Sequence, residues 1–251
     1  MSNLSDIGFP VRGEQDVNEM IMQVLGNVVE IRCHNGFYLR FSDSSGAELY
    51  LQGNPEQELI GFNPHFAGKS RRKVALTEAV ERDSSELDGG FHAWANPLDE
   101  TGETGDYPFV FNSPDFRAVH LHEFPKTVEI QLTAFASNDF KIFANEMDFN
   151  EKQESELKYA AKSFVPSGLF SLDENEIIDL SLVHPIGIFA GEIISFKEKT
   201  NSLTNGKFYH FLVDTLGGEI DVVADAKLIT EEPKIGGIVS GQFWLSGKIY
   251  G

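Results

Sequence analysis

Disulfide bonds, positive charge and long apolar runs are all scarce in this sequence. The one cysteine, Cys33, cannot form an intramolecular disulfide, and a chain stabilised without bridges fits a reducing compartment. The first residues lack a basic stretch followed by an apolar core, and no apolar run approaches the ~18 residues that cross a bilayer. We therefore expect a cytoplasmic protein without a membrane partner, in which Cys33 is an inert strand residue.

Basic side chains are also few. The chain has 20 Lys and Arg against 39 Asp and Glu, which gives a net charge of −19. A surface this acidic repels phosphate backbones, because nucleic-acid affinity depends on cationic side chains that neutralise phosphates. The charge therefore disfavours nucleic acid as a partner. The acidic stretches could instead attract a basic partner, or simply form a solvated face.

Familiar catalytic signatures are absent as well. The sequence has no glycine-rich dinucleotide fingerprint, phosphate-binding loop, nucleophile elbow or His-Glu-x-x-His zinc motif. We therefore predict a non-catalytic protein with no cofactor.

Strand-like segments dominate what is present. The 251 residues exceed the size of a typical single domain, and 41% hydrophobic residues suffice for buried cores. Residues 14–26 carry apolar side chains at helical spacing, whereas most of residues 28–145 read as short strands separated by turn residues. Residues 69–82 fit either a strand or a helix, and we favour a strand. No internal repeat is evident.

These patterns predict a mainly β (α+β) protein with a helix-capped antiparallel β domain at residues 1–145. Residues 146–184 are acidic and rich in helix formers, so we predict a partly helical connector there. Residues 186–251 are predicted to form a small β-barrel.

The predicted barrel has strand-like runs that alternate with turns. Its segments are IGIFAGEIISF, KFYHFLVDT, EIDVV and IVSGQFWLSG, and the apolar phase changes near Gly191, as expected where a strand bends. The pattern resembles the oligonucleotide/oligosaccharide-binding (OB) fold, a five-stranded, partly open barrel. Such barrels stack ligands on aromatic side chains. The resemblance implies Tyr209, Phe211 and Trp244 as ligand-binding residues, although aromatics of a barrel also fill its core.

Two further clusters could bind ions. His120 and His122 would project to one face of a strand and could share a metal ion. Lys69, Arg71 and Lys73 could bind an anion, or pair with the protein's own carboxylates.

The function that we predict is a soluble binding or interaction protein whose ligand is a protein or a small molecule. One alternative is single-stranded nucleic-acid binding through the barrel. Another is a metal-dependent enzyme that uses His120 and His122. The oligomeric state stays open.

Overall fold

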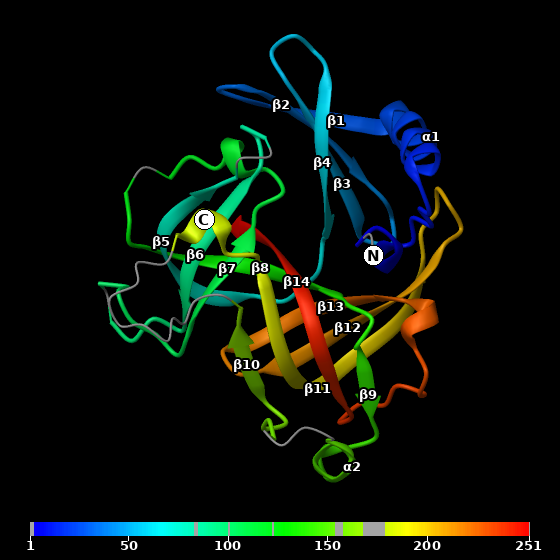
Figure 1. Ribbon diagram of the computed structural model, residues 1–251, viewed down its shortest axis with the longest axis vertical. Coiled ribbons are helices and arrows are strands. Elements are labelled where there is room, and N and C mark those ends of the chain that lie inside the picture. Colours follow the sequence, from blue (N-terminus) through cyan, green and yellow to red (C-terminus); the bar gives the residue numbers. More distant parts are fainter. Residues whose placement is uncertain are drawn as a thin grey trace.

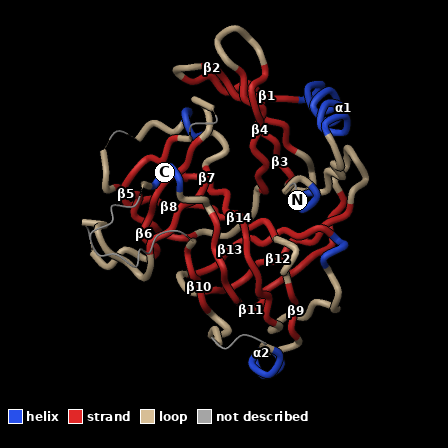
Figure 2. Tube along the Cα trace, viewed as in Figure 1, coloured by secondary structure: helices blue, strands red, loops and turns tan. Residues whose placement is uncertain are grey.

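The computed structural model describes residues 3–82, 85–99, 101–121, 123–153, 158–167 and 179–250. Strands make up most of its regular structure (Figure 2), which confirms the predicted mainly β class. The helices are α1 (Glu14–Val24) and α2 (Glu146–Lys152), and short 3-10 turns include η1 (Ser5–Ile7), η2 (Leu25–Asn27), η3 (Phe116–Ala118), η4 (Leu180–Leu182) and η5 (Ala226–Leu228). The strands are β1 (Val28–Cys33), β2 (Gly36–Ser42), β3 (Ala47–Gly53), β4 (Leu59–Phe66), β5 (Arg72–Glu81), β6 (Gly89–Ala95), β7 (Pro108–Asn112), β8 (Lys126–Ala136), β9 (Lys141–Phe143), β10 (Ser163–Pro166), β11 (Ile186–Thr200), β12 (Lys207–Thr215), β13 (Gly218–Asp225) and β14 (Ile238–Tyr250).

The N-terminal part forms a four-stranded antiparallel sheet in the order β1-β2-β3-β4. Its tight turns use glycines in backbone conformations that other residues rarely adopt, with φ of 142° at Gly36 and 98° at Gly46. Helix α1 packs on one face of this sheet through Met20 and Val24, which join the core that contains Phe41. The outer part of the sheet projects beyond the rest of the molecule at the top of Figure 1.

The other strands form a sheet that closes on itself to make two rings. The first ring runs β5-β6-β7-β14-β8 and the second runs β11-β12-β13-β8-β14, so that β8 and β14 belong to both. In each ring a meander of three antiparallel strands is completed by one strand from its own half of the chain and one from the other half. The rings cannot be separated without breaking the pairing between β8 and β14.

The two rings have bulges and parallel strand pairs at corresponding places in their strand pairing. A bulge interrupts β5 between Leu76 and Glu78, and an equivalent bulge interrupts β11 between Ile193 and Ser195. Parallel pairs close the rings at corresponding places, Asn112 with Ser246 in the first ring and residues 221–223 with residues 133–135 in the second. The chain therefore contains an internal structural repeat that its amino-acid sequence does not display.

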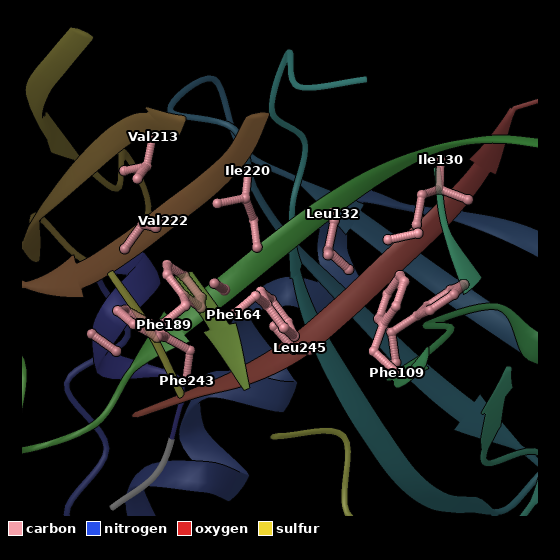
Figure 3. Packing of buried hydrophobic residues seen from close by; sticks show 14 of the residues in the cluster. Phe109, Ile130, Leu132, Phe164, Phe189, Val213, Ile220, Val222, Phe243 and Leu245 are labelled. Carbon is pink, nitrogen blue, oxygen red and sulfur yellow. The ribbon is translucent and has the colours of Figure 1, made fainter. Parts of the chain in front are cut away.

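One hydrophobic core runs through both rings. Side chains from β8 and β14 lie between the aromatic and aliphatic residues of the two meanders (Figure 3). Phe109 and Phe111 come from the first ring, Phe189 and Val213 from the second, and Phe243 from the shared strand β14. Because β8 lies within the predicted domain 1–145 and closes the ring of residues 186–250, the two halves of the chain share their interior.

The predicted connector holds α2 and β10 among its described residues, and residues 154–157 and 168–178 lie outside the description. No helix within the described ranges is long and apolar enough to span a membrane.

Candidate functional site

The three aromatic residues predicted to bind a ligand do not form one surface. Phe211 is 0% exposed and lies in the core of the second ring, so its ring does not reach solvent. Tyr209 is half-buried at the end of the same core, and its hydroxyl donates to Glu198 at 3.2 Å. Trp244 packs edge-on against Phe135 on the opposite side of the barrel wall. The apolar area of Phe211 is therefore used in the core, and the ligand-binding role of the three residues stays a prediction.

The predicted anion-binding residues are dispersed. Lys69 lies in the loop before β5, where its backbone N–H donates to Asp221 at 3.3 Å. The guanidinium of Arg71 lies 4.1 Å from the centre of the Tyr250 ring and 3.6 Å from Glu129. Lys73 is exposed on β5 opposite Glu129. The register thus places Lys73 and Arg71 next to the protein's own carboxylate.

The predicted metal pair is only partly described. His120 is exposed, and His122 lies outside the described residues. Across the described ranges, no three histidine, cysteine or carboxylate side chains come together as a metal-binding group.

A buried polar cluster joins the four-stranded sheet to the shared strands. His65, from β4, contacts the Ser246 hydroxyl at 2.9 Å through Nδ1 and the Gln131 side-chain oxygen at 2.8 Å through Nε2. The Gln131 amide donates in turn to Asp221, which also contacts His210 at 2.7 Å. We name this group the polar junction, and its members are His65, Ser70, Gln131, Thr133, His210, Asp221 and Ser246.

The polar junction places a serine hydroxyl next to a histidine, as in a catalytic nucleophile with its general base, but its burial argues for a structural role. Ser246 and His65 are almost completely buried, so no substrate reaches the hydroxyl. Burial lowers the pKa of His65 and keeps the imidazole neutral. Burial alone would raise the pKa of Asp221, but hydrogen bonds from His210 and Ser70 outweigh it and lower that pKa. The junction therefore satisfies the polar groups that the packing of the two sheets buries.

An open groove with a mixed polar and apolar lining lies on the outer part of the four-stranded sheet. Its volume is about 680 Å³, and we name it the β1 groove. Strand alternation directs Phe37 and Leu39 of β2 to the same face as Glu30 and Arg32 of β1. Leu25 and Leu59 complete the apolar lining, so this face continues the surface on which α1 packs. The remaining lining residues are Cys33, His34, Gly36, Pro55 and Gln57.

The groove is bordered by a free sheet edge. Strand β1 pairs with β2, and no other strand pairs with it among the described residues. Cys33 and Gly36 flank a two-residue turn and form the hydrogen-bonded pair beside it. Because hydrogen-bonded and non-hydrogen-bonded positions alternate in an antiparallel pair, the N–H and C=O groups of Glu30 and Arg32 point away from β2. These groups are available to another strand.

Side chains along this edge are exposed. Val29 is 56% exposed, and the side chain of Arg32 is 87% exposed while it contacts Glu30 at 2.7 Å. An exposed ion pair of this kind contributes little to stability, so both charges can exchange partners at low cost. Burial raises the pKa of the Cys33 thiol, which disfavours the reactive thiolate.

The residues of β1 are predicted as a strand from the sequence, but not as part of a site. A usable signal was present, since the first strand of an antiparallel meander is an edge strand unless a later segment pairs with it. Comparison with protein-family models, with curated proteins and with solved structures found no match to this chain.

Proposed function

We propose that this protein is a non-catalytic interaction module that binds an extended segment of a partner protein along β1. The observation that carries the proposal is the outer edge of β1, which no second strand among the described residues pairs with, beside the β1 groove. In strand addition, the edge supplies backbone hydrogen bonds while alternate side chains of the incoming segment enter pockets on one face of the sheet. The β1 groove lies beside this edge on one face of the sheet, where alternate side chains of the bound segment would enter it.

The lining of the groove suits apolar anchors. Leu59 is 40% exposed, and Phe37 and Leu39 are only partly buried. Covering a side chain of this size stabilises a complex by roughly 1.5–3 kcal/mol when it becomes fully buried. Two or three such contacts together with main-chain hydrogen bonds are typical of peptide recognition.

Charge supports a basic partner. The chain carries a net charge of −19, and the β3–β4 hairpin that contributes Leu59 also bears the exposed Glu56 and Glu58. A cationic segment would approach this surface faster than a neutral one, with an on-rate that falls as salt increases.

The strand order of the two rings supports a finer proposal, that each is a barrel of the OB type. Each ring has five strands, with a three-stranded meander and two further strands that complete it, as in a five-stranded Greek-key barrel. The interiors are filled by core side chains, so in this proposal the barrels act as a rigid scaffold for the four-stranded sheet.

A displayed library of random peptides, selected against the immobilised protein, tests the interaction. Selected peptides should lose at least roughly tenfold in affinity when Leu59→Arg places a charge in the groove. The same change at Leu98, which is 73% exposed and does not line the β1 groove, is the matched control. Glu30→Pro removes one outward N–H that a bound strand would use, so it should also weaken binding. The fold should survive this change, because proline is tolerated at such edge positions. Selection of no peptide, or binding that ignores Leu59→Arg, would refute the proposal.

A further inference from the structure

We propose that β1 also pairs with β1 of a second copy of this chain, in an antiparallel pair that is centred on Ile31 and competes with the partner segment for the same edge. This inference rests on the proposed function, because it uses the same free edge. A two-fold axis at Ile31 places Glu30 of one copy opposite Arg32 of the other, and Arg32 opposite Glu30. The edge is thus self-complementary in charge, which a two-fold interface requires.

The register follows from two physical requirements. Only outward-facing N–H and C=O groups can bond across the new pair, so Glu30 and Arg32 must lie opposite outward-facing positions. An axis between two residues would place outward-facing groups opposite inward-facing ones and form no ladder. An axis at Glu30 or at Arg32 satisfies the first requirement but places like charges directly opposite each other, which is destabilising. Axes at Val29, Ile31 and Cys33 satisfy both requirements, and of these only the axis at Ile31 places Glu30 and Arg32 opposite each other in both directions.

The pair also covers apolar surface. On the face opposite the groove, Val29 of one copy comes to lie across from Cys33 of the other, so a side chain that is 56% exposed gains a neighbour. On the groove face, Phe37 and Leu39 of the two copies extend one apolar surface across the new pair. A continuous sheet formed in this way removes the exposed edge that a free β1 leaves.

Net charge acts against association. Two chains of charge −19 repel each other, so the reciprocal Glu30–Arg32 contacts select the register more than they drive affinity. We therefore expect a reversible dimer that depends on protein concentration.

Charge-exchange variants of the full chain test the proposal by sedimentation velocity over a range of protein concentrations. The wild-type protein should dimerise, whereas Arg32→Glu and Glu30→Arg should each associate at least roughly tenfold more weakly. The double variant restores opposite charges and should recover dimerisation. A mixture of the two single variants should form a heterodimer, because one presents two arginines and the other two glutamates. Damage to the fold would not produce this recovery.

Amide hydrogen exchange provides a second measurement. In the dimer, the amides of Glu30 and Arg32 should gain protection as protein concentration rises, while those of Val29 and Ile31 are already bonded to β2.

The outcomes separate this inference from the proposed function. A wild-type protein that stays monomeric while its groove selects peptides overturns the self-pairing and leaves the interaction module intact. A dimer that is indifferent to the charge variants overturns the Ile31 register. Absence of both dimer and peptide binding overturns both proposals.

Discussion

Replacing Asp6 with asparagine should stabilise this protein at neutral pH. Asp6 lies in η1, is 3% exposed, and accepts a hydrogen bond from the Asp225 N–H at 2.8 Å. Burial raises the pKa of this carboxyl from 3.8 to about 8, against the lowering effect of the Asp225 hydrogen bond. The asparagine oxygen can accept the same bond without a charge.

The magnitude follows from proton linkage. Because the folded pKa lies above the unfolded one, the contribution of Asp6 to stability is present below about pH 3.8 and is lost as pH rises toward about 8. Each pH unit in this interval costs about 1.36 kcal/mol. The cost by neutral pH is on the order of 4 kcal/mol, so Asp6→Asn should gain most of that amount there and little near pH 4.

Urea unfolding of both proteins, followed by circular dichroism from about pH 4 to pH 8, measures this difference. Other titrating groups cancel in the comparison. Glu56→Gln removes one negative charge from an exposed turn and should give a difference that is small and independent of pH. A stability gap for Asp6→Asn that does not grow with pH would contradict the reasoning.

Three further substitutions test the core and the polar junction. Phe211→Ala should lower the free energy of unfolding by about 3–5 kcal/mol because it empties a site in the second ring; calorimetry that finds less than about 1 kcal/mol would mean that the ring is not packed there. Gly68→Ala should destabilise the protein by about 1–3 kcal/mol, because a Cβ there would lie 2.0 Å from the Asp221 carboxyl. Gly13→Ala is the control, because a Cβ at Gly13 meets open space. Equal unfolding midpoints for the two variants would argue against this contact. Burial lowers the pKa of His65 from 6.5, so the contribution of His65 to stability is present above pH 6.5 and is lost as pH falls below it. His65→Gln should remove this loss from the pH dependence of the free energy of unfolding. An unchanged loss of stability below pH 6.5 would contradict the reasoning.

Local chemistry was sufficient to predict much of the secondary structure. Apolar spacing predicted a helix at residues 14–26, and α1 spans Glu14–Val24. The ambiguous segment at residues 69–82 forms the strand β5, as favoured. The turns at Gly36 and Gly46 fall where glycine follows polar residues, because few other residues adopt those backbone angles.

The candidate site depended on which segments of the chain cover each strand, and the sequence pattern does not show this. Alternation shows that Phe211 and Trp244 lie on strands and point to one of two sides, but it does not show what covers either side. Phe211 is enclosed because β8, from the preceding half of the chain, closes the ring around it. The edge of β1 could not be predicted for the same reason, because it depends on whether any other strand of the chain pairs with β1.

By itself, the sequence determined the strands, the helix α1, the hairpin turns and the acidic charge, since these follow from side chains that are close neighbours along the chain. Tertiary structure alone decided that β8 and β14 are shared by two rings and that, within the described part of the chain, only β2 pairs with β1. The physical reason is that strands pair through backbone groups, which every residue carries, so the choice of partner is made by the packing of the whole chain.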